Sequence, residues 1–201
     1  MSRNIKKLAI LFALPVLTAA SLAQAAITPI GVTASSTLFS YNANNLINNS
    51  GLIGDLHDGN FNNMWLDDNR TLGGDAVLTF DLGQNYQLTG SLVWQSNSDF
   101  DYTRNTKDLD ILTSLDGINF IKAGSYTLSQ STGGNIPAQT LSFNAVARYV
   151  KFDILTNYGS DGFTGLSEVK FIEAVPEPES YAMFLAGLGL IGLIGKQRKA
   201  K

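Results

Sequence analysis

The feature that most constrains the fold is a series of short segments, between residues 76 and 172, in which apolar and polar residues alternate. In residues 148–155, for example, Val150, Phe152 and Ile154 fall on one side of an extended chain. A period of two residues is that of a β-strand with one buried face. About seven such segments, with turn signals between them and no convincing helix outside the two ends of the chain, predict an all-β fold of the β-sandwich type, flanked by an N-terminal signal helix and a C-terminal hydrophobic helix. The expected strands are residues 77–83, 88–95, 108–113, 120–126, 141–143, 148–155 and 169–172.

The first 25 residues have the three parts of a secretory signal peptide. Arg3, Lys6 and Lys7 form a basic start, residues 8–17 an apolar core, and Ala23–Gln24–Ala25 the small-x-small pattern that signal peptidase cleaves. An uncleaved anchor is the alternative, and so clean a cleavage pattern disfavours it. The sequence therefore predicts an exported protein with a signal peptide at residues 1–25 and a folded domain at residues 26–174.

The last stretch, residues 175–201, has a different composition. Two prolines fix the backbone at its start and keep a helix of the domain from running into it. An apolar, glycine-spaced run follows at residues 181–195, shorter than the roughly 20 residues that span a bilayer core without tilt. The basic end should stay on the cytoplasmic side, because Lys and Arg resist translocation. Its basic residues are Lys196, Arg198, Lys199 and Lys201.

This tail resembles the PEP-CTERM sorting signal of Gram-negative bacteria, since Pro176–Glu177–Pro178, an apolar segment and a basic terminus occur in that order. The resemblance implies transient insertion of the tail into the inner membrane and cleavage by an exosortase near Pro176 to Pro178. It also implies delivery of the domain to the cell surface or the extracellular matrix. An ordinary C-terminal membrane anchor is the alternative, although such an anchor has no need of Pro-Glu-Pro.

Charge and cysteine content exclude several functions. Residues 26–175 hold seven basic and fifteen acidic side chains, a net charge near −8. Nucleic acids and anionic lipid surfaces need basic patches, so this charge argues against both and suits divalent cations and neutral polymers better. The chain has no cysteine, which excludes thiol catalysis and requires an exported domain to be held together by a hydrophobic core or by metal.

A series of short sequence words, in order along the domain, is similar to the discoidin domain (coagulation factor 5/8 type C). The resemblance implies the galactose-binding-like jelly roll, a non-catalytic module that binds glycans or other polymers with loops at one end of its sandwich. Two departures are the absence of the terminal cysteine pair of many animal members and Asn63 where a Thr is common. The words are Asn45–Leu46–Ile47, Asp58–Gly59–Asn60 with Trp65, residues 78–83, 113–120, 148–151 and 165–171.

The turn at residues 58–63 is the strongest candidate for a metal site. Oxygen-bearing side chains at alternate positions on a turn suit a hard cation such as Ca²⁺, and Gly59 lets the backbone fold around it. The resemblance implies a structural Ca²⁺ at this place, held by Asp58, Asn60, Asn63 and the late Glu168. An Asx-turn that binds no metal is the alternative.

Aromatic and polar residues in the loops are the candidates for ligand binding. A sugar is commonly held by an aromatic face beside Arg or Asn donors. Trp65 and Trp94 are expected in the core instead, and the loop aromatics could equally cover the core. The candidates are Tyr41, Tyr102, Arg104, Asn105, Tyr158 and Phe163.

Catalysis is not expected. His57 is the only histidine, and no serine lies in a nucleophile motif such as G-x-S-x-G. Neighbouring acidic pairs are more typical of solvated charges than of glycosidase carboxylates. These pairs are Asp67 and Asp68, Asp99 and Asp101, and Asp108 and Asp110. The sequence as a whole predicts a module that binds extracellular polysaccharide or a surface glycan. The alternative is a structural matrix or adhesion protein that binds other proteins and has no glycan pocket.

Overall fold

The computed structural model describes residues 25–68, 76–98, 100–174 and 185–188. The described domain is built almost entirely of antiparallel strands, as expected, and the only α-helix within these ranges is the single turn at residues 185–188. No helix in these ranges is long and apolar enough to cross a membrane. Residues 1–24 of the predicted signal peptide and the Pro176–Glu177–Pro178 motif lie outside the described residues.

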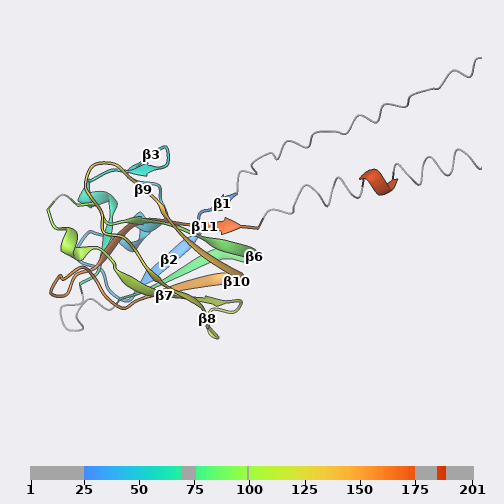
Figure 1. The fold of residues 1–201 in the computed structure, drawn as a ribbon. Helices are drawn as coiled ribbons and strands as arrows, with labels where there is room; N and C mark the ends of the chain where they lie inside the picture. The colour runs from blue at the N-terminus through green and yellow to red at the C-terminus, as the bar shows by residue number, and fades with distance from the viewer. Residues whose placement is uncertain (1–24, 69–75, 99, 175–184, 189–201) are drawn as a thin grey trace, which may run out of the picture.

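Two long strands form the frame of the domain (Figure 1). β6 (Ala76–Gln95) and β10 (Gln139–Ile154) pair with each other over almost their whole length. β2 (Gly31–Ala34) pairs with the first part of β6, and β11 (Gly165–Glu173) pairs with its second part. The remaining strands are β1 (Ala26–Ile27) and β5 (Trp65–Leu66) beside β11, β7 (Asp108–Ser114) beside β10, β8 (Ile121–Thr127) beside β7, and a small sheet of β3 (Leu52–Ile53), β4 (Leu56–His57) and β9 (Ile136–Pro137).

The two long strands bend, and so each of them belongs to both layers of the sandwich. Near the bend Gly83 has a φ of 87°, and the pairing of β6 with β10 changes register between Ala147 and Tyr149. Register shifts of this kind re-aim a strand and let it turn a corner between layers. The expectation of separate strands at 77–83 and 88–95, and at 141–143 and 148–155, was therefore wrong: each pair is one continuous strand, because the residues between its members form a bend and not a turn.

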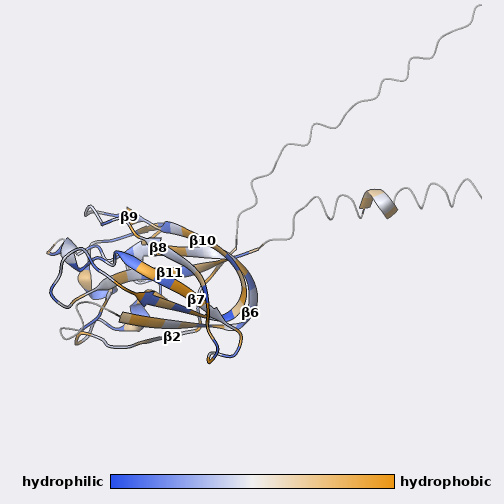
Figure 2. Cartoon of the chain, turned by 60° about the horizontal axis from the view of Figure 1, so that its bottom comes forward, coloured by the Kyte–Doolittle hydropathy of each residue, from blue (hydrophilic) through white to orange (hydrophobic). Residues whose placement is uncertain are grey.

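The core lies between the layers and consists of the apolar members of the alternating segments. Figure 2 shows the hydrophobic and hydrophilic residues along the strands. Phe80 of β6, Phe152 of β10 and Phe171 of β11 are fully buried and pack edge to face, with ring centroids 5.2 to 6.2 Å apart. Trp65 and Trp94 are buried as expected, and each indole N–H donates to a main-chain carbonyl oxygen. The apolar residues that alternate with polar ones in the sequence thus form one continuous hydrophobic core.

The first and last strands of the domain are neighbours. Ala26 pairs with Ile172, and the amide of Glu173 donates to the carbonyl oxygen of Ala25 at 3.2 Å. The amide of Ala174 donates to the carbonyl oxygen of Gln87 at 2.7 Å, so the chain leaves the domain beside the bend of β6. Figure 1 shows this end of the domain at the right and the short helical turns of the loops at the left.

Candidate functional site

A pocket of about 280 Å³ opens among the loops that follow the end of β6 at Gln95, away from the bends. An aromatic row forms part of its wall: the rings of Tyr41 and Phe61 are 5.9 Å apart, and those of Phe61 and Phe100 are 5.7 Å apart. Phe100 is 84% exposed, which leaves most of its ring available for contact with a ligand. The lining residues are Tyr41, Phe61, Met64, Leu66, Ser96, Ser98, Phe100, Asp101 and Arg104.

Much of the polar wall of the pocket lies at a 3-10 turn, η3 (Tyr102–Arg104), and at its N-cap residue Asp101, and Ser96 and Ser98 supply the rest. Asp101 caps this turn, because its carboxylate accepts from the main-chain amide of Thr103 at 2.9 Å and also from the Thr103 hydroxyl. Nε of Arg104 donates to the other carboxylate oxygen of Asp101 at 3.1 Å. The guanidinium lies 4.8 Å from the ring centroid of Phe163, which holds it in place by a cation–π contact.

The pocket therefore presents an acceptor and donors side by side. Hydrogen bonds from Thr103 and the charge of Arg104 hold the pKa of Asp101 below its usual range, so the carboxylate is ionised at neutral pH. Because Arg104 balances this charge, the pocket as a whole is close to neutral.

Of the residues predicted to bind ligand, Tyr41 and Arg104 line the pocket and Phe163 lies against Arg104. Tyr102 is on η3, and its carbonyl oxygen accepts from the side-chain amide of Gln130 at 3.0 Å. Tyr102 itself is not among the residues that line the pocket.

Tyr158 lies apart from the pocket lining. Its hydroxyl donates to the carbonyl oxygen of Leu128 at 2.7 Å, and its ring is 5.8 Å from Nζ of Lys107.

Asn105 is fully buried, and its side chain faces the interior. The amide group donates to the carbonyl oxygen of Ser96 at 2.7 Å and to its hydroxyl at 2.9 Å. The amide oxygen accepts from the main-chain amide of Ser131 at 2.6 Å and from its hydroxyl at 2.7 Å. With its polar groups engaged by two loops, Asn105 joins the loops beneath the pocket.

Phe61, Phe100 and Asp101 were not singled out from the sequence. Phe61 falls within the turn that was assigned to metal, and Asp101 within an acidic stretch that was assigned to solvent. The signal that could have found Phe61 and Phe100 is the one that selected Tyr41, an aromatic residue inside a polar loop.

The predicted metal turn is closed by hydrogen bonds to Asp58. Its Oδ1 accepts from the main-chain amide of Asn60 at 3.0 Å, and the side-chain amide of Asn63 donates to Oδ1 at 3.3 Å and to Oδ2 at 3.1 Å. Asn60 in turn caps η2 (Phe61–Asn63), where its side chain accepts from the amide of Asn62. The turn that carries the pocket residue Phe61 is thus the turn that Asp58 organises.

Glu168, the fourth predicted metal ligand, is fully buried in β11. Its Oε2 accepts from the main-chain amide of Asn49 at 3.1 Å, whereas Oε1 is buried and has no hydrogen-bond partner among the residues that the structure describes. Burial raises the pKa of Glu168 to about 7, with Lys170 and the Asn49 amide acting in the opposite direction.

The segment around Gly51 lies between Glu168 and the Asp58 turn. Gly51 has a φ of +78°, and a Cβ placed on it would come within 2.8 Å of Asp58 Oδ1 and 2.7 Å of the His57 ring. Gly51 lies two residues after Asn49, whose main-chain amide donates to Glu168. Residues 49–51 therefore connect Glu168 to the Asp58 turn, the two parts of the predicted metal site. In the described part of the chain no three Asp, Glu, His or Cys side chains converge, so a cation here would depend on amide and carbonyl oxygens as well.

His57 is buried beside this turn, and its Nδ1 lies 2.9 Å from the main-chain carbonyl oxygen of Asp58. The carboxylate of Asp58 is farther away, at 3.8 Å. The histidine is therefore held by a carbonyl group, in contrast to the carboxylate-oriented histidine of a catalytic triad.

The fold is shared with known carbohydrate-binding modules. A domain of a family 31 glycoside hydrolase from Clostridium perfringens (CBM32-3) has a TM-score of 0.58 at 16% identity and covers 74% of this chain and 95% of its own. The family 32 module of NanJ from C. perfringens, in complex with galactose, has a TM-score of 0.58 at 18% identity and covers 74% and 98%. The CBM32 of AlyQ, in complex with 4,5-unsaturated mannuronic acid, has a TM-score of 0.53 at 21% identity and covers 75% and 99%.

Family comparisons agree with the fold. No curated protein sequence matches the chain significantly. The F5/8 type C domain family matches residues 31–169, and the PEP-CTERM protein-sorting motif matches residues 174–199. The chain therefore belongs to the F5/8 type C (discoidin-like) domain family and carries a PEP-CTERM sorting motif at its C-terminal end.

Proposed function

We propose that this protein is an exported, non-catalytic carbohydrate-binding module whose pocket holds one sugar ring of an extracellular polysaccharide or surface glycan. The observation that carries the proposal is the aromatic row of Tyr41, Phe61 and Phe100 beside Arg104 and Asp101. Aromatic rings stack on the C–H faces of a sugar, and the charged pair can donate to and accept from its hydroxyl groups. Galactose and 4,5-unsaturated mannuronic acid in the two related complexes support a sugar as the ligand class.

We infer that a neutral sugar fits this pocket better than a uronic acid. Arg104 is the cation among the residues that line the pocket, and its Nε already bonds to ionised Asp101. A sugar carboxylate would lie near Asp101 and be repelled, whereas neighbouring hydroxyl groups can use both side chains. The Asp101–Arg104 pair therefore disfavours a negatively charged sugar, and it can still form hydrogen bonds with the hydroxyl groups of a neutral one.

The test is a glycan array followed by calorimetry with the best neutral sugar and the corresponding uronic acid. Phe100→Ala should weaken binding about tenfold through loss of stacking. Arg104→Ala should weaken it roughly tenfold to a hundredfold through loss of charge-assisted hydrogen bonds. Ile118→Ala is the matched control, because Ile118 is 81% exposed, as Phe100 is 84%, and lies at the other end of the domain. Failure to bind any glycan, together with self-association, would favour a structural matrix protein instead.

We also propose a structural Ca²⁺ held by Asp58, Asn60, Asn63 and Glu168. The support is the buried and unpartnered Oε1 of Glu168, the carboxylate of Asp58 across the segment around Gly51, and the supply of oxygen donors. When bound, such an ion supplies a positive charge that compensates buried Glu168 and ties the early loop to the last strand. The domain has no disulfide, so this connection would add stability where a covalent one is missing.

The PEP-CTERM motif implies export and a surface or extracellular location. We propose that signal peptidase removes residues 1–25, that the tail stays in the inner membrane of a Gram-negative cell as a precursor, and that an exosortase then cleaves near Pro176 to Pro178. Intact-mass analysis of the protein from its native host tests this processing. A mass that ends near residue 176 supports exosortase cleavage, whereas a mass that includes Lys201 indicates a retained anchor.

A further inference from the structure

The end of the domain from which the tail departs carries exposed apolar side chains. The main-chain amide of Ala174 donates a hydrogen bond to the carbonyl oxygen of Gln87, and Gln87 pairs with Val146 of β10. Val146 is 54% exposed, although it is a β-branched residue in a strand. Ile30, 71% exposed, lies over Gly83 at the same bend of β6, where a Cβ on the glycine would be 3.1 Å from its Cδ1. Exposed apolar residues that occur singly need no explanation, but these lie beside one exit point.

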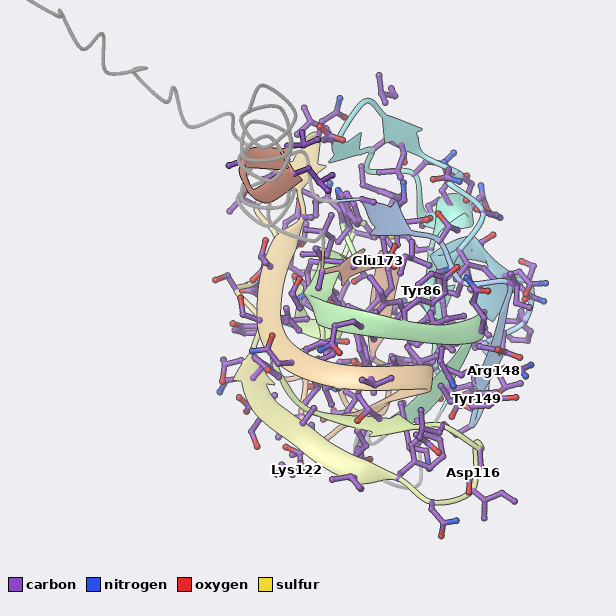
Figure 3. The ribbon with its side chains drawn as sticks, turned by 90° about the vertical axis from the view of Figure 1, so that its right-hand side faces the viewer. Tyr86, Asp116, Lys122, Arg148, Tyr149 and Glu173 are labelled. Atoms are coloured by element: carbon purple, nitrogen blue, oxygen red, sulfur yellow. The ribbon has the colours of Figure 1, made fainter. Side chains whose placement is uncertain are left out.

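The hairpin between β7 and β8 adds three exposed apolar side chains to the same end of the domain. Leu115, Ile118 and Ile121 are 56%, 81% and 76% exposed. Tyr149 at the start of the second half of β10 pairs with Ser114, which places the hairpin next to the bends. Figure 3 looks at this end of the domain, where five of the labelled residues follow one another from the middle of the view to its lower right in the order Glu173, Tyr86, Arg148, Tyr149 and Asp116.

The hairpin tip is preorganised. Asp116 accepts from the main-chain amides of Ile118 at 2.9 Å and Asn119 at 2.8 Å, and from the side-chain amide of Asn119 at 2.7 Å. Gly117, with a φ of +75°, packs on the ring of Tyr149, which a Cβ would approach to 3.3 Å. A rigid tip that holds Ile118 outward loses little conformational entropy when it meets a partner surface.

The charges at this end are largely paired. Arg148 donates to both carboxylate oxygens of Asp81 at 2.9 and 3.0 Å, and Nζ of Lys122 lies 2.7 Å from Asp110. Attraction to an anionic surface is therefore weak here, in agreement with the acidic charge of the domain. This end of the domain can therefore contact a partner surface mainly through its exposed apolar side chains.

We propose that this apolar rim (Ile30, Leu115, Ile118, Ile121 and Val146) rests on the lipid surface while the tail is still attached. Only six residues separate Ala174 from the apolar run that begins at Tyr181, a reach of about 20 Å when fully extended. When the run is in a bilayer, this end of the domain is therefore held at the membrane interface, where exposed apolar side chains are stabilised. The inference rests on the proposed membrane stage of the tail, and it points the sugar pocket away from the membrane.

The test uses the absence of cysteine from the chain, which makes any introduced cysteine unique. The mature chain with its tail, residues 26–201, is labelled with an environment-sensitive fluorophore at Ile118→Cys or, independently, at Ile121→Cys. Ile53→Cys is the matched control, an isoleucine that is 67% exposed in β3, away from the tail exit (Figure 1). Each protein is mixed with phosphatidylcholine vesicles, floated on a density gradient, and exposed to a lipid-attached quencher.

The expected result is flotation of all three proteins, with a blue shift and quenching for the probes at 118 and 121 and neither at 53. Flotation with equal emission at the three positions would overturn the docking and leave membrane insertion of the tail intact. Absence of flotation would overturn both. A blue shift at 118 that needs no vesicles and grows with protein concentration would identify a second copy of the chain as the occupant and also overturn the proposal. Sugar binding, measured on the same samples, fails or succeeds independently of these outcomes.

Discussion

The main-chain amide of Asn49 donates to Oε2 of Glu168 at 3.1 Å and so connects the asparagine-rich region near the start of the domain to its last strand. The other carboxylate oxygen of Glu168 is buried, and no residue in the described part of the chain donates a hydrogen bond to it. A half-satisfied acid in the interior destabilises the fold when it is ionised, unless a cation compensates it. This arrangement has consequences for pH dependence and for metal binding that can be measured separately.

In the absence of calcium, the domain should lose stability as the pH rises from about 4.5 to above 7. Burial raises the pKa of Glu168 to about 7, so the folded state holds its proton more tightly than the unfolded state does. The contribution is fully present below the unfolded pKa and is lost as the pH rises through the folded pKa, a loss on the order of 3 kcal/mol for this shift. Urea unfolding between pH 4 and pH 8 in the presence of a chelator measures it.

Glu168→Gln keeps the shape and the acceptor for Asn49 but cannot ionise. Its unfolding free energy should therefore lack this fall between pH 4.5 and 8. If wild type and Glu168→Gln respond to pH in parallel, the carboxyl group of Glu168 does not titrate in this range.

Calcium should raise the melting temperature of the wild-type domain by several degrees. A ligand at a hundred times its dissociation constant stabilises the folded state by about 2.7 kcal/mol. Asp58→Ala should abolish the calcium-dependent rise, and it should also lower the melting temperature without calcium because the turn loses its bonds to Asn60 and Asn63. Asp55→Ala, which removes an exposed carboxylate three residues earlier, should keep the full response to calcium. Identical melting curves with calcium and with chelator in the wild type would contradict the metal site.

Much of the fold can be predicted from local pattern. The alternation in residues 148–155 places Val150, Phe152 and Ile154 in the core, where the structure has them, and no helix competes for these segments. The continuity of β6 through residues 83–87 could not be predicted, because a polar stretch with a glycine reads the same whether it ends a strand or bends it. The strand continues because both halves of β6 pair with β10, and this pairing is a long-range interaction.

The site was predicted less completely for a related reason. Tyr41 and Arg104 carry a local signal, aromatic or cationic in a polar loop, and both line the pocket. Asn105 carries the same kind of signal but is buried, because its partners Ser96 and Ser131 come from two other loops. Whether a polar loop residue faces solvent or ties loops together depends on which loops fold beside it, and that information is not local.

Substitution of Asn105 should therefore mainly lower stability, whereas substitution of its neighbour Arg104 should mainly weaken sugar binding. Asn105→Ala leaves buried polar groups of Ser96 and Ser131 without partners, and it should cost about 2–3 kcal/mol of unfolding free energy. Arg104→Ala removes a partly exposed ion pair and should cost less than about 1 kcal/mol, while it weakens sugar binding. Urea unfolding and calorimetry on both variants separate the two roles. Loss of affinity in Asn105→Ala without loss of stability would contradict the assignment of Asn105 to loop support.

The Asp81–Arg148 pair at the bend should stabilise the domain modestly at neutral pH. Hydrogen bonds from Arg148 hold the pKa of Asp81 below its usual range, so its contribution is present above about pH 4 and is lost as the pH falls below that value. Asp81→Ala should cost about 1–2 kcal/mol, because it also removes the acceptor for the Gly83 amide. Arg148→Ala should cost less than Asp81→Ala, since the guanidinium is exposed and solvent screens its charge.

Urea unfolding of wild type, Asp81→Ala and Arg148→Ala at pH 7 and pH 3 tests these values. The difference between wild type and either variant should shrink at pH 3, where Asp81 is protonated in the unfolded state and increasingly so in the folded state. Equal differences at the two values of pH would show that the pair acts through packing and not through charge.

The strongest single effect on stability should come from the aromatic cluster that joins the two layers. Phe152→Ala removes a fully buried ring that contacts Phe80 and Phe171 at centroid distances of 5.2 and 6.2 Å, and such a cavity costs about 3–5 kcal/mol. Phe39→Ala is the matched control, because the ring of Phe39 is 85% exposed and its removal should change stability by less than about 0.5 kcal/mol. Urea unfolding gives both values. Because Phe80 and Phe152 lie on strands that bend between layers and Phe171 lies on β11, loss of the Phe152 ring should destabilise both layers together. A biphasic unfolding curve for Phe152→Ala would show instead that the layers unfold separately.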